Sequence, residues 1–296
     1  MRRFLLAAVM FGTASGAQAA DMPDFLRGSI AASPPPLNRN WDGWYVGGQV
    51  GYESAEIDFS RSVVSLTNFI FRNSTLQAPT SDWSLLNKNH AQGSSFGAFV
   101  GRNYQWEDIV FGFEANYSYF NNTKSSSSSS IALGIVNPPG TTPPPGHTYT
   151  YNTSMTGAAA LEVKDVVTLR GRAGWATSNF LPYVFGGVAV GRMNVARSVS
   201  TNVVLRDDEV VTTDIGGVMT TFSLPPVFTA IPSLSQSNSE QRTNSFVAGW
   251  TGGLGMEYMM WGNLFMRGEW EYIKFLKVKD TVVTLNSVRL GIGYKF

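Results

Sequence analysis

Apolar residues recur at every second position along most of this chain, and the last segment shows the pattern most clearly. Its apolar residues are Val288, Leu290, Ile292, Tyr294 and Phe296. Small or charged residues fill most of the positions between them. Because successive side chains of a strand point to opposite faces, this alternation predicts a β-strand with one apolar face.

Seven more segments predict strands. Residues 96–106 place Arg102 on an otherwise apolar face, from which its long side chain can reach an interface. Residues 181–191 are apolar in both registers, so the faces of that strand stay unassigned. The other five alternate cleanly and are residues 44–52, 109–119, 167–175, 254–258 and 264–272.

The connections between these eight segments alternate in length. Three are tight turns, at residues 105–108, 177–180 and 260–263. Of the four connections on the other side, three are long, at about 57–92, 121–162 and 194–244, and only the last, near 275–281, is short. Short turns on one side and long loops on the other are typical of bacterial outer-membrane barrels. We therefore predict an all-β fold, an eight-stranded antiparallel transmembrane β-barrel with short periplasmic turns, long extracellular loops and periplasmic termini. An extra hairpin at residues 63–71 would instead give ten strands.

Charge gathers on the face opposite the apolar one. A soluble β-fold would point its charges outward and its large apolar residues inward, whereas a barrel in lipid does the reverse. An uncharged apolar exterior would also aggregate in water. The predicted inward charges are Glu53, Glu114, Arg170, Arg172, Glu257, Arg267, Glu269, Glu271, Arg289 and Lys295.

These inward charges predict a network of ion pairs. They comprise five acidic and five basic residues, and charges buried away from water must be paired. The interior of an eight-stranded barrel is just wide enough for side chains to fill it. We expect a closed barrel, and the alternative is a narrow pore with charged walls.

Composition excludes several other classes of protein. Only 15% of the 296 residues are charged, against about 25% in soluble globular chains. Cysteine is absent, which excludes disulfides, thiolate metal sites and a cysteine nucleophile. The 22 basic residues nearly balance the 21 acidic ones, so no nucleic-acid partner is expected.

The two ends of the chain carry export signals. Residues 1–20 combine a basic start, an apolar run and small residues, which predicts a cleaved signal peptide, and cleavage after Ala19 or after Ala20 stays open. Residues 21–40 are expected to form a periplasmic linker and residues 41–296 the outer-membrane β-barrel. In the last strand, the residues predicted to form the outer-membrane insertion signal are Leu290, Ile292, Tyr294 and Phe296.

Catalytic motifs are weak. Residues 93–97 match G-x-S-x-G around Ser95, but a nucleophile elbow needs a helix after the serine, and a strand follows here. His90 and His147 lie in predicted loops without a convincing acidic partner. We expect no enzyme activity, no metal site and no cofactor. A less favoured alternative is haem-iron ligation by His147 with a nearby residue, the candidates being Tyr149, Tyr151 and Met155.

The long loops are partly low in complexity. Residues 125–130 are all serine, and proline and glycine cluster at 138–146. Such segments cannot bury enough apolar surface to order themselves, so we expect them to stay disordered. Apolar runs within residues 203–231 either extend the neighbouring strands above the membrane or meet a partner.

Four stretches resemble a known family. They are WDGWYVGGQVGY from Trp41, TLRGRAGWATSNFLPYVFGGVAVG from Thr168, AGWTGGLGMEY from Ala248 and the closing VRLGIGYKF. They resemble the alphaproteobacterial outer-membrane immunogenic, porin-like surface proteins, which belong to the OmpA-like eight-stranded barrels. The resemblance covers the strands and turns but not the long loops. It implies a surface antigen of the cell envelope, in a family whose members are often called porins and in which haemin binding is reported for some.

The sequence therefore predicts an outer-membrane protein with a structural and surface-interactive role in envelope integrity and loop presentation. The main alternative is a small, weakly selective porin for ions or small solutes, and the less favoured one is surface binding of haemin or another ligand. The expected partners are outer-membrane lipid and lipopolysaccharide, the barrel-assembly machinery during insertion, and an extracellular partner of the loops.

Overall fold

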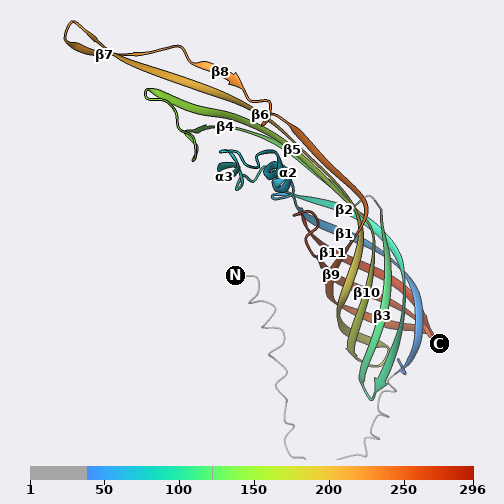
Figure 1. The fold of residues 1–296 in the computed structure, drawn as a ribbon. Helices are drawn as coiled ribbons and strands as arrows, with labels where there is room; N and C mark the ends of the chain where they lie inside the picture. The colour runs from blue at the N-terminus through green and yellow to red at the C-terminus, as the bar shows by residue number, and fades with distance from the viewer. Residues whose placement is uncertain (1–38, 122) are drawn as a thin grey trace, which may run out of the picture. The chain divides into compact units, whose positions relative to one another are not determined.

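Eight strands of this protein close into an antiparallel barrel (Figure 1). The computed structural model describes residues 39–121 and 123–296, so the predicted signal peptide and nearly all of the predicted linker lie outside the described residues. β11 pairs with β1 and closes the ring, which confirms the predicted fold. In pairing order the barrel strands are β1 (Gly43–Asp58), β2 (Lys88–Trp106), β3 (Ile109–Asn121), β5 (His147–Trp175), β6 (Phe180–Ile215), β9 (Ser237–Trp261), β10 (Leu264–Phe275) and β11 (Val282–Lys295).

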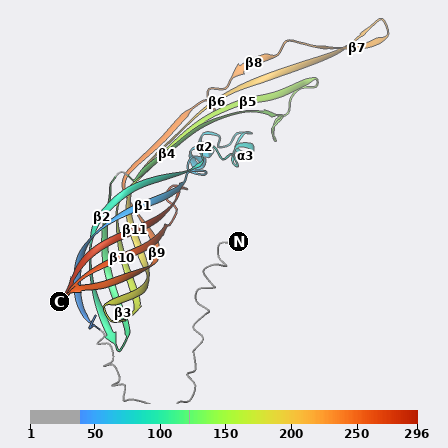
Figure 2. The ribbon, with the colours of Figure 1, turned by 180° about the vertical axis from the view of Figure 1, so that it is seen from behind.

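The three tight turns gather at one end of the barrel, the end where β11 finishes (Figure 2). They join β2 to β3, β5 to β6 and β9 to β10. Each contains a residue in the left-handed region, with φ of 55° at Glu107, 53° at Ser178 and 53° at Gly262. Outer-membrane barrels keep short turns in the periplasm, so the opposite end of this barrel is extracellular.

Three barrel strands continue beyond the barrel, and the part of the sheet that they form there is what we call the extension. The upper parts of β5, β6 and β9 remain paired there. β4 (Lys124–Val136) adds to the free edge of β5, and two short strands, β7 (Val218–Ser223) and β8 (Val227–Ala230), pair with the upper part of β6. The extension therefore consists of β4, β7, β8 and residues 147–163, 194–215 and 237–244.

The serine run is ordered, contrary to what its composition led us to expect. Residues 125–130 lie in the first half of β4 and pair with residues 156–161 of β5. The ladder satisfies the backbone groups that face β5, so the segment needs little apolar surface of its own. Ile131 and Ile135, further along β4, pack against the apolar core of the extension. Of the apolar runs within residues 203–231, those at 203–205 and 210–211 extend β6, and the run at 222–231 lies in and around β7 and β8.

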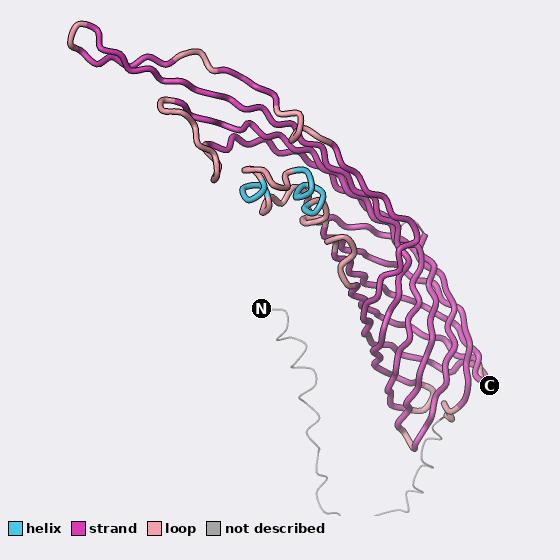
Figure 3. The backbone as a smooth tube through the Cα atoms, in the orientation of Figure 1, coloured by secondary structure: helices cyan, strands magenta, loops and turns pink. Residues whose placement is uncertain are grey.

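The strands are irregular at the level where the barrel passes into the extension. β3 gives way to β4 there, and β9 contains Asn244 in the left-handed region, with φ of 54°. β5 shifts its register between Val163 and Asp165, and β6 between Met193 and Val195. Bulges bend a strand and increase its twist. Several at one level bend the whole sheet, so one face of the extension is concave (Figure 3).

The connection from β1 to β2 covers this concave face. It contains α2 (Val64–Ile70) and α3 (Gln77–Thr80), so residues 63–71 form no hairpin and the ten-strand alternative is wrong. Among the described residues, no helix is long and apolar enough to cross a membrane. The connection and the extension share one buried core, which contains Phe59, Val63, Leu66, Ile70, Phe71, Leu76, Leu85, Leu86, Met155, Ala159, Leu161, Val163, Val195, Val199 and Val203.

The outward side chains of the barrel are mostly large and apolar. Val50, Val184 and Leu290 are each 61% exposed. Arg102 lies on this outward face, as predicted, and pairs with Asp42 at 3.3 Å near the periplasmic end. An apolar surface of this extent meets lipid rather than water.

Candidate functional site: the barrel lumen

The lumen is filled by three successive layers of side chains, and the first, nearest the short turns, is aromatic. The ring centroids of Trp41, Tyr45 and Phe99 lie 6.4, 5.9 and 6.3 Å from that of Phe265. The backbone amide of Trp41 donates to the side-chain oxygen of Gln105 at 2.5 Å, which holds the segment before β1 in place. All four rings are almost completely buried. This aromatic layer closes the periplasmic end.

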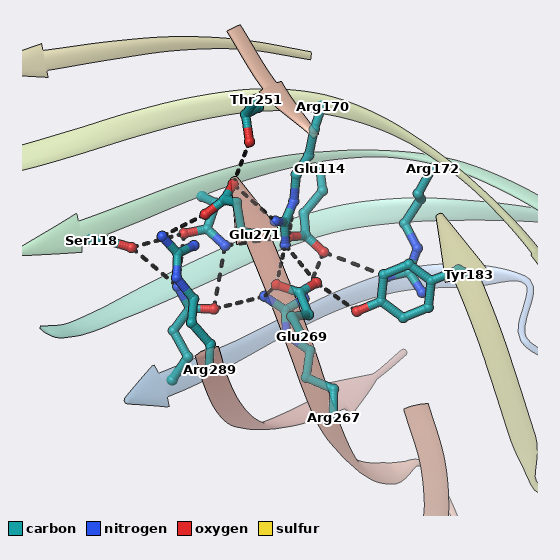
Figure 4. A network of polar contacts seen from close by, with 12 residues as sticks. Glu114, Ser118, Arg170, Arg172, Tyr183, Thr251, Arg267, Glu269, Glu271 and Arg289 are labelled. Atoms are coloured by element: carbon teal, nitrogen blue, oxygen red, sulfur yellow. Dashed lines mark hydrogen bonds and ion pairs between the residues drawn. The ribbon is translucent and has the colours of Figure 1, made fainter. Parts of the chain in front are cut away.

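The second layer is charged, and Arg170 lies at its centre (Figure 4). The guanidinium of Arg170 lies 2.5 Å from Glu114, 2.7 Å from Glu269 and 3.5 Å from Glu271. Glu114 is the direct cross-strand neighbour of Arg170, whereas the other two carboxylates come from β10, on a distant part of the wall. The ion pairs therefore join separate walls of the barrel across the lumen.

Arg267 extends the charged layer toward β1. It lies 2.8 Å from the second oxygen of Glu114 and donates to Gln49 at 2.8 Å. Its guanidinium stacks over the ring of Phe99, 3.4 Å from the ring centroid. Such a cation–π contact compensates part of the hydration that a buried cation loses.

Arg172 makes a similar set of contacts at the edge of the charged layer that faces the periplasmic end. It pairs with Glu257 at 2.8 Å and donates to the hydroxyl of Tyr45 at 3.1 Å. Its guanidinium lies 3.9 Å from the ring centroid of Tyr183. Arginine side chains and aromatic rings thus interleave where the first two layers meet, which leaves little free space between them.

At the edge of the charged layer that faces the extracellular end, the buried polar atoms are less completely hydrogen-bonded. Arg289 lies 2.5 Å from Glu271, and the hydroxyl of Ser95 donates to Glu53. Within the described part of the chain, Nε of Arg289, Oε2 of Glu53 and Oγ of Ser287 are buried without a hydrogen-bond partner. Buried polar atoms of this kind are normally satisfied by ordered water. This level of the lumen is therefore where internal water is expected.

The third layer is apolar and closes the extracellular end. Its inward side chains belong to the same continuous core that packs beneath α2. The apolar core therefore runs without interruption from the upper barrel into the extension. The barrel residues in it are Ala55, Ile57, Ala91, Phe120, Val166, Ala189, Met193, Val247, Ile273, Phe275, Val283 and Leu285.

Nine of the ten predicted inward charges lie together in the lumen, and Lys295 lies apart. Its ammonium group donates to the backbone oxygen of Asp42 at 2.9 Å, at the periplasmic end. The aromatic layer separates it from the charged layer, because the rings occupy the space beside the glycines of β11. A Cβ on Gly293, for example, would lie 2.4 Å from the ring of Phe265. The predicted place of Lys295 in the ion-pair network is therefore wrong.

Sequence reasoning missed two lumen tyrosines. Tyr45 and Tyr183 both donate to carboxylates of the charged layer, at 2.8 and 2.5 Å. Tyr45 lies between two outward side chains, so the alternation itself could have placed it inside. Tyr183 lies in the strand whose faces stayed unassigned, and the structure points it inward together with Leu181 and Phe185.

The predicted insertion signal lies on the outer face of the barrel. Leu290, Ile292, Tyr294 and Phe296 are 61, 58, 47 and 70% exposed. This placement puts all four side chains toward lipid. Their recognition by the assembly machinery stays a prediction.

The weak catalytic motif does not assemble a site. Ser95 points into the lumen and bonds to Glu53, whereas His90 is exposed on the other face of β2. The structure does give His147 an acidic partner, because Nδ1 lies 2.9 Å from Asp207 on β6. The expectation that it lacks one was wrong, since the pairing of β5 with β6 brings the two residues together over a long sequence distance.

One of the three candidate haem ligands beside His147 is excluded. Met155 lies buried beneath α2, and its sulfur accepts a hydrogen bond from the hydroxyl of Thr67 at 3.4 Å. It is therefore not available as a second ligand beside His147. In the described ranges there is also no group of three or more His, Cys, Asp or Glu side chains that could hold a metal ion.

A closed antiparallel barrel with an apolar exterior and short turns at one end defines an integral outer-membrane β-barrel protein. The family model "Outer membrane protein beta-barrel domain" matches residues 4–296, so the chain belongs to this family, and its location is the bacterial outer membrane. The chain is 23% identical over 200 residues to the 25 kDa outer-membrane immunogenic protein of Brucella ovis, a match that covers 68% of this chain and 62% of that protein. The resemblance to the alphaproteobacterial immunogenic proteins is thereby confirmed.

Solved structures of other surface barrels are also similar. Neisserial surface protein A shares 15% identity, with 86% of this chain and 97% of that chain covered and a TM-score of 0.32. Ail, the attachment invasion locus protein of Yersinia pestis, shares 11% identity, with 86% and 99% covered and a TM-score of 0.28. Similarity at this level says nothing about the activity of this chain.

Proposed function

We propose that this protein is a closed outer-membrane scaffold that anchors a folded extracellular sheet and contributes to envelope integrity. The filled lumen is the observation that carries the proposal. A solute path would have to cross the aromatic layer, the ion pairs around Arg170 and the apolar core beneath α2. Small barrels have no spare width beyond their side chains.

The extension supports the display part of the proposal. A barrel that served only to pack lipid would need loops just long enough to join its strands. Here β5 and β6 are 29 and 36 residues long, and about 10 residues suffice for a transmembrane strand. The additional strand length builds a sheet on the outside of the cell, and its apolar face continues the core of the upper barrel beneath α2. We therefore propose an extracellular partner for the extension, with outer-membrane lipid and lipopolysaccharide around the barrel.

Single-channel recording tests the closed lumen directly. The refolded protein in a planar bilayer should give no reproducible conductance steps, while heat-modifiable gel migration confirms that the barrel is folded. Steps of constant size that change in Arg172→Ala would overturn the proposal and establish the porin alternative. We expect no enzyme activity from either form of the barrel.

A further inference from the structure

The far end of the extension is an apolar hairpin that the described chain leaves uncovered. We call residues 210–228 the apolar tip. β6 and β7 pair here through a two-residue turn at Gly216 and Gly217, with φ of 65° and 87°, the left-handed values that glycine adopts readily. Nine large apolar side chains of the tip are 39–69% exposed, and they are Val210, Val211, Ile215, Val218, Met219, Phe222, Leu224, Val227 and Phe228.

The exposed apolar side chains surround the hairpin rather than forming one flat patch. Ile215 is paired with Val218 on one face, directly beside the turn. Met219 points to the opposite face, where it is 69% exposed. Val227 and Phe228 are consecutive in β8, so their side chains also point to opposite faces. A flat protein partner would cover one face of this ribbon, whereas a bilayer surface accepts apolar groups from both faces and from the turn.

The charge distribution favours a neutral lipid surface. Residues 215–239 contain no ionisable side chain. Before the tip, Arg206 and the three acidic residues 207–209 form an acidic collar. A fourth acidic residue, Asp214, lies within the tip opposite Met219, and its carboxylate accepts a hydrogen bond from the backbone amide of Gly217 in the turn at 2.6 Å. Anionic lipid would repel this collar within a Debye length, while zwitterionic lipid would not.

β6 carries the tip away from the barrel (Figure 1). From Met193, at the bend, to Ile215 the length along the strand is roughly 70 Å at the rise of an extended strand. We propose that the apolar tip inserts into the interfacial region of a neutral phospholipid bilayer that faces the bacterial surface. The insertion is shallow, because the outer backbone edges of the hairpin would lose their hydrogen bonds to water in the hydrocarbon core. This inference rests on the proposed display role of the extension.

Flotation with vesicles tests the proposal. The full chain, folded in nanodiscs, is mixed with phosphatidylcholine vesicles and with vesicles that also contain phosphatidylglycerol. We expect co-flotation with the neutral vesicles, weaker co-flotation with the anionic ones, and a loss of about tenfold or more in Ile215→Ser/Val218→Ser. The matched control is Leu133→Ser/Val136→Ser, because these side chains of β4 are 45 and 59% exposed and lie outside the tip.

A fluorescent probe gives an independent readout, since the chain has no cysteine of its own. An environment-sensitive dye on Val218→Cys should shift to the blue on addition of neutral vesicles, and the same dye on Ser128→Cys should not. Absent flotation, equal loss in the control variant, or stronger binding to anionic vesicles would overturn the proposal. So would self-association without vesicles that Ile215→Ser/Val218→Ser abolishes, because the tip would then cover a second copy. Conductance in the planar bilayer would overturn the proposed closed scaffold, and it is measured independently of vesicle binding by the tip.

Discussion

The barrel and the extension share strands, yet the two faces of those strands exchange polarity between the two regions. On β5, the inward side chains change from Arg172 and Arg170 in the barrel to Leu161 and Met155 in the extension. On β6, the outward side chains change from Val184 and Val188, both well exposed, to polar and small residues over 194–202. The outer face changes at the bend, beside the Asp165–Arg192 ion pair, whereas the inner face is already apolar in the third layer of the barrel.

This difference shows that the surroundings, rather than the strand, decide which face carries charge. In the barrel the outer face meets lipid, so charges point inward and must be paired. In the extension the outer face meets water, so the apolar residues point inward beneath α2 and α3. The barrel has no free edge, whereas β4 ends the extension without a further strand among the described residues. We therefore expect the barrel to tolerate heat and denaturant better than the extension.

The largest expected difference between the barrel and the extension is the loss of stability in Arg170→Ala, in the charged layer. Loss of Arg170 leaves Glu114, Glu269 and Glu271 short of a buried cation, so we expect destabilisation of about 3–5 kcal/mol. The matched change in the extension is Arg206→Ala, which removes an ion pair to Asp208 at 2.7 Å with 45% of the arginine side chain exposed. That change should cost less than about 1 kcal/mol. Urea unfolding in lipid vesicles measures both, and equal effects would contradict the contrast.

Leu161→Ala tests the apolar core of the extension. Leu161 is 1% exposed and packs beneath the β1–β2 connection, so its truncation should cost about 2–5 kcal/mol locally. We expect faster proteolysis of the residues between Phe59 and Leu86, with unchanged heat-modifiable migration of the barrel. Leu133→Ala, at a position 45% exposed on β4, should have little effect. If Leu161→Ala also lowered the melting temperature of the barrel, the two regions would be one cooperative unit.

Period-2 alternation was sufficient to predict the barrel. Each tight turn lies where the sequence predicted it, and nine of the ten inward charges line the lumen. Alternation reports which side chains share a face, so it could predict the charged layer as a set. It could not predict contacts across the lumen, such as Arg170 to Glu269, because those depend on the curvature of the whole ring.

Period-2 alternation could not predict the extension, because its order depends on strand pairing and on contacts between distant segments. The serine run of β4 has no apolar pattern, and it is ordered by its ladder with β5 and not by its own side chains. The connection from β1 to β2 contains apolar residues at no strand period, and their partners on β5 and β6 lie about 100 residues away in the sequence. For Lys295 the predicted face was correct, but its predicted ion pairs were wrong. The aromatic rings beside Gly293 separate it from the charged layer.

Acid should loosen the extension before the barrel, through Glu240. Lys279, Arg197 and Arg242 hydrogen-bond to this carboxylate and lower its pKa from about 4.5 to about 2. A carboxyl group whose pKa is lower in the folded protein than in the unfolded chain stabilises the fold at any pH above the unfolded pKa. This stabilisation is lost as the pH falls through the folded pKa. The contribution, about 1–2 kcal/mol after allowance for exposure, should therefore vanish between about pH 4.5 and pH 2.

Pepsin cleavage of the extension over this pH range measures the effect of Glu240. Glu240→Gln should be cleaved faster than the parent protein at pH 5, and the difference should disappear near pH 2. Glu209→Gln is the control, because that carboxylate lies 3.9 Å from His147 and forms no ion pair with a lysine or arginine of the described residues. A pH dependence that survives in Glu240→Gln would show that another group controls the acid response.

The smallest expected effect concerns the bend itself. Asn244 adopts a left-handed conformation with φ of 54°, and its backbone N–H donates to the side-chain oxygen of Asn194 on β6 at 2.9 Å. Asparagine tolerates this conformation better than other residues with a Cβ, so Asn244→Ala should cost up to about 1 kcal/mol and Asn244→Gly almost nothing. Urea unfolding should show the loss in the extension alone, since barrel pairing below the bend is regular in β6 and β9. An equal loss for alanine and glycine would mean that the side chain of Asn244, and not its backbone conformation, holds the two regions at their angle.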